Sequence, residues 1–170
     1  MRRLHLVRHG RPLVDRSRPA HTWGLDPAGL DAVEALRDRL PAGAPWYSSP
    51  EPKAHDTALL VAETPVTVVD GLREHVRDTT TWCDDFPDTV RQALAEPNQS
   101  ALPGWEPVTA LRDRLLPAVR RLLDVDPAPE LVLCGHGTAW TVLVSELTGA
   151  PPDLDRWAAL AMPDVLVVDL

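Results

Sequence analysis

Short apolar runs that alternate with amphipathic helical stretches are the feature that most constrains the fold of this chain. The apolar runs, each typical of a buried strand, cover residues 3–8, 46–47, 66–69, 131–134 and 165–170. Helical patterns lie between them, and the last of these follows Gly137. Strands that alternate with helices in this way predict a three-layer α/β domain.

Proline and other turn residues mark the ends of the predicted helices. The first helix is predicted from Asp26-Pro27 to Leu40, and the second from Ser49-Pro50 to about Glu63, since a capping residue followed by proline is a helix start. The longest helix is predicted to begin at Glu106-Pro107. Pro117 lies inside its apolar pattern and predicts a kink there.

Residues 73–105 differ from the rest of the chain. The stretch is acidic and is interrupted by three prolines, with a short helix predicted only around 88–95. We therefore predict a lid-like insertion at about 73–105 within a single domain that spans residues 1–170. Trp82 and Trp105 flank the acidic part and are candidates either for packing of the lid or for lining a substrate pocket.

The charge balance excludes two classes of partner. The chain carries 17 Lys and Arg against 25 Asp and Glu, a formal net charge of −8. This balance argues against a general nucleic-acid surface and against an anionic membrane surface. Any anion that binds must be held by a local cationic pocket. Only one of the 17 cations is a lysine, Lys53, which makes its position informative.

The cysteines and histidines give no metal or redox pattern. Cys83 and Cys134 are far apart and are expected to be free thiols in a reducing compartment. The six histidines lack the spacing of helical metal ligands, so neither a metal nor another cofactor is predicted. No stretch resembles a signal peptide or reaches transmembrane length, and the expected location is cytoplasmic.

Two predicted strands end in a histidine beside a glycine. Arg8-His9-Gly10 follows the first strand, and Gly135-His136-Gly137 follows the fourth. Open α/β sheets hold their ligands at the carboxyl ends of strands. His9 and His136, together with Arg8, are therefore candidates for one site, and Arg11 is a further candidate for contact with phosphate or substrate.

Lys53 is predicted in the first turn of the second helix, where the helix dipole disfavours a cation. A cation at that position is more plausible if an anion lies in front of it. The N–H groups at a helix start also bind phosphate. Lys53 is thus a candidate ligand for an anionic substrate.

The ordered motifs of the chain resemble those of the histidine phosphatase (phosphoglycerate mutase-like) superfamily. The motifs are, in order, Leu6–Gly10, Ser48-Ser49-Pro50 with Lys53-Ala54 and Thr57-Ala58, Leu72-Arg73-Glu74, and Cys134–Gly137. Each is short, but the set of four spans nearly the whole chain. The resemblance implies a Rossmann-like fold with a mostly parallel sheet and a phosphohistidine mechanism that uses no metal.

The resemblance also implies roles for individual residues. His9 would be the nucleophile, Arg8 and His136 would bind the phosphate, and Glu74 would donate the proton. Lys53 stands where many members carry arginine. The lysine keeps the positive charge but offers a point charge in place of the planar guanidinium. The expected substrate is a small phosphorylated metabolite.

These residue types suit phosphoryl transfer. The reaction requires an in-line nucleophile and stabilisation of charge on the equatorial oxygens. Nearby cations lower the pKa of an imidazole, which would keep His9 neutral and nucleophilic. A bound dianionic phosphate would raise the pKa of Glu74, so that this carboxyl group could hold a proton for the leaving oxygen.

Two other functions remain open from the sequence. A phosphoglycerate or phosphosugar mutase must hold a second anionic group, and the acidic balance of residues 73–105 does not favour one. An inactive phosphate- or protein-binding module on the same fold is the other alternative. The presence of Arg8, His9, Glu74 and His136 argues against it. We therefore expect a metal-independent phosphomonoesterase.

Overall fold

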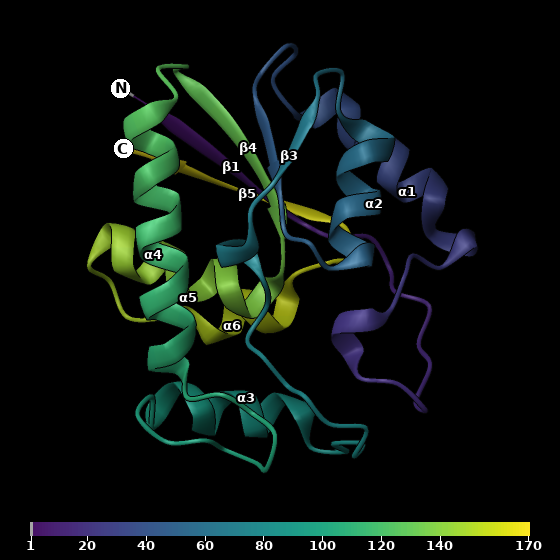
Figure 1. Ribbon diagram of the computed structural model, residues 1–170, viewed down its shortest axis with the longest axis vertical. Coiled ribbons are helices and arrows are strands. Elements are labelled where there is room, and N and C mark those ends of the chain that lie inside the picture. Colours follow the sequence, from purple (N-terminus) through teal and green to yellow (C-terminus); the bar gives the residue numbers. More distant parts are fainter. Residues whose placement is uncertain (1) are drawn as a thin grey trace.

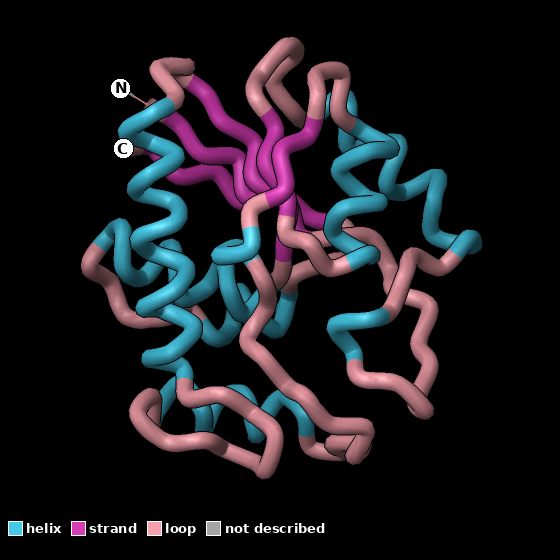
Figure 2. Tube along the Cα trace, in the orientation of Figure 1, coloured by secondary structure: helices cyan, strands magenta, loops and turns pink. Residues whose placement is uncertain are grey.

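The computed structural model describes residues 2–170, and its five strands lie between helices on either side (Figures 1 and 2). The strands are β1 (Arg3–Arg8), β2 (Trp46–Ser48), β3 (Val66–Val68), β4 (Glu130–Gly135) and β5 (Asp164–Asp169). The helices are α1 (Leu30–Glu34), α2 (Pro52–Val61), α3 (Phe86–Ala95), α4 (Val108–Val125), α5 (Gly137–Thr148) and α6 (Leu154–Ala159).

The sheet has the strand order β3-β2-β4-β1-β5 and is mostly parallel, as predicted. β1, β2, β3 and β4 all run in one direction, and only the edge strand β5 is antiparallel to its neighbour. β1 and β4 are adjacent, with Arg8 opposite Gly135. The two His-Gly turns therefore leave the sheet side by side at its carboxyl edge.

Alternating side chains of the strands bury both faces of the sheet. Leu4 and Leu6 of β1 pack in a core with α4 and α5, whereas Val7 packs in a second core with α1 and α2. Figure 1 shows the same division, with α4 and α5 on one side of the strands and α1 and α2 on the other. The fold is thus a three-layer α/β arrangement. Trp140 of α5 is fully buried and its indole N–H donates to the carbonyl of Val7, which ties α5 to β1.

Two helices differ in detail from the prediction, and a third agrees with it. The first is not one helix over 26–40 but a 3₁₀ turn, the short α1 and a second 3₁₀ turn, because only Val33 and Leu36 of this stretch are buried. α2 begins at Pro52 rather than Pro50, since the Ser49 hydroxyl accepts the N–H of Glu51. α4 begins directly after the predicted start at Glu106-Pro107 and is one helix through Pro117. The ring of Pro117 is exposed while the neighbouring Leu115 and Val119 are buried, and the kink there stays a prediction.

Residues 73–105 run away from the sheet and return to it. The chain is extended after a short 3₁₀ turn at Asp70–Leu72, forms α3, and comes back into α4. In Figure 1 α3 lies beyond the lower end of α4. Val90, Trp105 and Trp157 form a small separate cluster that holds this segment against α6.

Candidate active site

A cavity of about 640 Å³ opens at the carboxyl edge of the sheet. Its floor is formed by the ends of β1 and β4 and by the start of α2, and it contains Arg8, His9, Lys53 and His136. Residues 73–78 and the loop around residues 18–23 form its walls. Glu74 belongs to the wall. The cavity therefore brings together five of the six predicted site residues.

His9 is oriented through its Nδ1 atom. This nitrogen lies 2.7 Å from the carbonyl oxygen of Gly10 and donates to it, since a carbonyl can only accept. The proton is thus fixed on Nδ1, and Nε2 carries the free lone pair. Burial lowers the pKa of His9 well below its usual value, and the charges of His136 and Lys53 lower it further. His9 is accordingly a neutral imidazole with a free Nε2, which is the form of a nucleophile.

His136 lies beside His9, with 5.2 Å between the ring centroids. Its Nε2 is 2.9 Å from the Ser49 hydroxyl oxygen, and its Nδ1 is buried without a partner in the described residues 2–170. Burial lowers the pKa of His136 to about 4, although Glu51 and Glu74 oppose the shift. A bound anion would favour the protonated ring and would give it a hydrogen-bond acceptor.

Arg8 reaches the cavity from the end of β1. One of its terminal nitrogens donates to the carbonyl of Leu160, while its Nε is buried with no partner among the residues that the structure describes. Burial lowers its pKa, but Glu74 favours the charged form. Gly137 leaves room for this guanidinium, because a Cβ at that position would stand 3.2 Å from Arg8 Nε.

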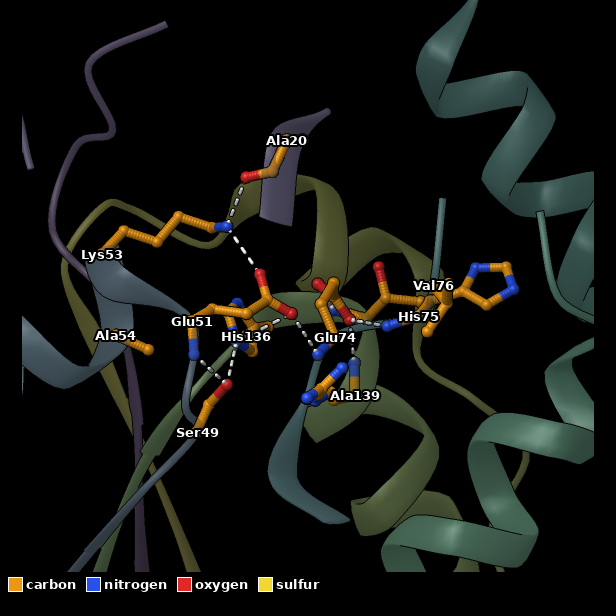
Figure 3. A network of polar contacts seen from close by, with 12 residues as sticks. Ala20, Ser49, Glu51, Lys53, Ala54, Glu74, His75, Val76, His136 and Ala139 are labelled. Atoms are coloured by element: carbon orange, nitrogen blue, oxygen red, sulfur yellow. Dashed lines mark hydrogen bonds and ion pairs between the residues drawn. The ribbon is translucent and has the colours of Figure 1, made fainter. Parts of the chain in front are cut away.

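Lys53 occupies the first turn of α2 as predicted, and an anion does lie in front of it. That anion is a side chain of the protein: Lys53 Nζ is 2.7 Å from Glu51 Oε2 and 2.7 Å from the carbonyl oxygen of Ala20 (Figure 3). Both side chains of this ion pair are buried. The ammonium group is therefore held at the cavity by partners on two sides.

Glu74 accepts three backbone hydrogen bonds. Two come from the first turn of α5, from Thr138 N at 3.2 Å and Ala139 N at 2.9 Å, and the third comes from His75 N at 2.8 Å (Figure 3). The guanidinium of Arg77 acts in the same direction. Burial raises the pKa of Glu74, but these partners outweigh it and lower the pKa to about 2. Without a bound phosphate, Glu74 is a carboxylate.

Arg11 is the one predicted site residue that does not line the cavity. Its side chain is half exposed and pairs with Asp26 at 2.9 Å. Trp82 and Trp105 are not part of the lining either. Trp105 packs on His75, and the Trp82 ring lies 3.8 Å from the guanidinium carbon of Arg16. The lining contains Trp23 of the first loop and Phe86 at the start of α3 instead.

Five charged residues of the cavity were not among the predicted site residues: Arg18, Glu51, Arg73, Arg77 and Asp78. Of these, only Glu51 and Arg77 are not exposed. Arg77 donates to Thr138 Oγ1 at 3.1 Å, with its guanidinium carbon 4.7 Å from the Phe86 ring centroid and 4.8 Å from that of Trp105. Glu51 is the buried partner of Lys53. The sequence position of Glu51, two residues before the predicted phosphate ligand Lys53, could have indicated that it lies at the site. For Arg77, the only such indication was its position three residues after Glu74.

The model of the histidine phosphatase superfamily (branch 1) matches residues 4–169, and the chain belongs to this superfamily. A search of curated proteins gave no match. Among solved structures, a mycobacterial glucosyl-3-phosphoglycerate phosphatase in complex with VO3 is similar with a TM-score of 0.76. It is 24% identical, and the match covers 99% of this chain and 93% of that one.

Two further structures are similar over nearly their whole length. A protein named mycobacterial hydrolase 1 matches with a TM-score of 0.74 and 23% identity, over 98% of this chain and 90% of that one. The protein TTHB049 from Thermus thermophilus matches with a TM-score of 0.71 and 26% identity, over 98% and 93%. The shared fold is thus that of histidine phosphatases. Within residues 2–170, no helix is long and apolar enough to span a membrane, and no cluster of residues suited to a metal ion occurs.

Proposed function

We propose that this protein is a metal-independent phosphomonoesterase that acts on a small phosphorylated metabolite through a phosphohistidine intermediate. The observation that supports it best is the orientation of His9. Its Nδ1–H is engaged by the Gly10 carbonyl, so the Nε2 lone pair is available beside Arg8, Lys53 and His136. A phosphoryl group held by those three residues would present its phosphorus to that nitrogen.

In the first step, His9 Nε2 attacks the phosphorus and the bond from phosphorus to the ester oxygen breaks. The negative charge of the bound phosphate raises the pKa of Glu74, so that this carboxyl group holds a proton. The leaving oxygen takes that proton from Glu74. In the second step, water attacks the phosphohistidine and gives its proton to the Glu74 carboxylate. The bond from phosphorus to nitrogen breaks, and inorganic phosphate and neutral His9 are released.

The cationic groups supply the electrostatic part of the catalysis. Charge on the three equatorial oxygens is stabilised by Arg8 and Lys53, and by His136 once the phosphate has favoured its protonated form. Arg8 Nε and His136 Nδ1 are buried polar atoms without a protein partner in the described chain, which supports a role for both residues in binding an anion. This chemistry requires no metal ion.

We also propose that residues 73–105 act as a lid-like part of a single domain that covers the leaving group. Residues 73–78 and Phe86 contribute to the cavity wall. The contact between Arg16 and Trp82 joins this segment to the first loop. The free thiols of Cys83 and Cys134 support a reducing compartment, as in the cytoplasm.

The test is to trap the covalent intermediate. Brief incubation with a ³²P-labelled phosphomonoester, followed by denaturation, should give a phosphoprotein that is labile in acid and stable in base. The His9→Ala variant should give none and should lose turnover. The assay in excess chelator should give the same rate as without it. A phosphomonoesterase activity that survives His9→Ala unchanged would refute the proposed mechanism, and a labelled product that is a second phosphate ester would favour the mutase.

A further inference from the structure

Glu51 is a buried carboxylate placed among the groups that would bind the phosphate. Its side chain is 6% exposed. Oε2 lies 2.7 Å from Lys53 Nζ, and Oε1 lies 3.6 Å from His136 Nε2. In Figure 3 the carboxylate stands between the Lys53 ammonium and the His136 ring. A phosphoryl group that engages both of these residues has to share them with Glu51.

The charged side chains inside the cavity, away from its exposed rim, compensate a dianion only in part. Among the cavity side chains that are not exposed, Arg8, Lys53 and Arg77 supply three positive charges, and Glu51 and Glu74 supply two negative ones. Arg18, Arg73 and Asp78 lie at the exposed rim of the cavity. Both imidazoles of the site are neutral at pH 7, since burial lowers the pKa of each. Before any group takes up a proton, the unexposed part of the free cavity thus has a net charge of +1, whereas a phosphomonoester above its second pKa of about 6 carries two negative charges.

The groups around Glu51 identify it as a carboxylate that would gain a proton. It receives Lys53 from α2, His136 from the start of α5, and the backbone N–H of Glu74 at 2.9 Å from the segment after β3. Arg77 is more distant but also contributes an electrostatic attraction. Burial raises the pKa of Glu51, and only these partners keep it lowered. A phosphate that also binds Lys53 and His136 brings negative charge close to Glu51, and this charge favours the protonated carboxyl group.

Glu74 is less suited to this role in the binding step. Its oxygens accept three backbone N–H groups that a phosphate cannot remove without unwinding the start of α5. Glu51 accepts one backbone N–H and otherwise depends on Lys53. Of the two carboxylates, Glu51 is therefore the one whose pKa depends more on groups that the anion also binds.

We infer that Glu51 makes the binding of a phosphoryl group proton-coupled: its carboxyl group takes up one proton as the anion engages Lys53, and its O–H then donates to a phosphate oxygen. This inference rests on the proposed function, because it assumes that the anion binds in this cavity. It adds to the site a residue that adjusts the charge of the cavity to the substrate.

The sign of the coupling follows from linkage. The carboxyl pKa of Glu51 is lowered in the free protein and is higher in the complex, so the complex binds more protons. Anion affinity should then increase as the pH falls between these two pKa values, by up to tenfold per pH unit for one proton. Above the pKa of the complex, the charged Glu51 weakens binding by a constant factor.

Sulfate is a suitable probe because it stays a dianion from pH 5 to 8, so that any proton uptake belongs to the protein. Calorimetric titrations in two buffers of different ionisation enthalpy give the number of protons taken up. For the wild type, we expect sulfate to bind more tightly at pH 5 than at pH 8 and to bring protons with it. The Glu51→Gln variant should take up about one proton fewer and should bind sulfate at least about tenfold more tightly at pH 8.

The controls separate charge from structure. Glu130→Gln removes another carboxylate that pairs with a histidine, His5, but at the opposite end of the sheet, and should behave as the wild type. Glu51→Ala provides a second variant, and thermal unfolding checks that each protein is folded. If Glu51 serves only to position Lys53, both Glu51 variants will bind sulfate more weakly at every pH, which would overturn the inference.

The outcomes also separate this inference from the proposed function. Sulfate that binds the wild type, with equal proton uptake in Glu51→Gln, would assign the proton to His136 or Glu74 and overturn the inference alone. Failure of both sulfate and vanadate to bind the wild type at any pH would overturn the proposed function, and the inference with it.

Discussion

The imidazoles of His9 and His136 face each other across the ends of two adjacent parallel strands, with ring centroids 5.2 Å apart and planes inclined by 64°. Each ring is held through one nitrogen, His9 by the Gly10 carbonyl and His136 by the Ser49 hydroxyl. Protonation of one ring disfavours protonation of the other because both are buried. The pair is therefore neutral until an anion arrives.

This arrangement predicts the titration of both histidines in the free protein. Following the ring resonances by NMR from pH 8 downward, we expect His9 to protonate well below pH 6.5 and His136 near pH 4. Vanadate or sulfate should shift the His136 midpoint upward, since a neighbouring anion stabilises the imidazolium. The variants His9→Asn and His136→Asn assign the resonances. A His136 midpoint at or above 6.5 in the ligand-free protein would contradict the predicted burial effect.

Lys53 should contribute through its charge and its position. Lys53→Ala removes a buried cation from the phosphate cavity and leaves Glu51 without its partner, so kcat/KM should fall by about 10²-fold or more. Lys53→Arg keeps the charge and should lose less. Arg11→Ala is the matched control, because Arg11 pairs with Asp26 outside the cavity, and its kcat/KM should change by less than about threefold. Equal losses in Lys53→Ala and Arg11→Ala would remove Lys53 from the site.

Most of the candidate site could be predicted from the sequence. Arg8, His9, Lys53 and His136 lie at strand ends and helix starts, and the sequence pattern predicts those boundaries. Their convergence needs only the order of parallel strands, which the pattern of apolar runs constrains. Arg11 was different, since its direction depends on how the first loop folds back to Asp26. That loop has no periodic pattern from which its path follows.

Glu51 and Arg77, the charged cavity residues outside the predicted set that are not exposed, illustrate the same point. Glu51 lies between two prolines, and an acid there is also expected at any helix start. Its contact with Lys53 depends on side-chain directions in a turn that no periodicity describes. Arg77 enters the cavity because the irregular segment after Glu74 bridges to Trp105 and directs it inward. Irregular segments therefore determine the positions of those site residues that the sequence motifs do not predict.

Gly10 should be required for packing rather than for an unusual backbone conformation. A Cβ there would lie 2.4 Å from Val33 Cγ2 and 3.0 Å from Leu25 Cδ2. Gly10→Ala should therefore lower the free energy of unfolding by about 1–3 kcal/mol, the usual cost of overpacking. Gly24→Ala is the control, since nothing lies within 4 Å of its added Cβ. Chemical denaturation measures both, and an unchanged stability of Gly10→Ala would show that α1 can move away from the turn.

The role of Glu74 as proton donor predicts a dependence on the leaving group. An alkyl phosphate expels an alkoxide, which needs a proton as the bond breaks, whereas nitrophenolate leaves with little help. General acid catalysis contributes about 10²–10⁴-fold, so Glu74→Gln should lose roughly that factor in kcat/KM on an alkyl phosphate and much less on nitrophenyl phosphate. Glutamine keeps one acceptor oxygen, which can still accept the N–H of Ala139, but it places an NH2 group opposite the N–H of Thr138.

The ratio of the two losses separates proton donation from a structural role of Glu74. If Glu74 only orders the start of α5 and the guanidinium of Arg77, the variant will lose the same factor on both substrates. Glu106→Gln is a matched control, because Glu106 also accepts a backbone N–H from this segment, that of Val76, but does not line the cavity. Its losses on the two substrates should be equal. Equal losses in Glu74→Gln as well would mean that Glu74 is structural, and the proton donor would then be sought among His75, Asp78 and Glu51, which also line the cavity.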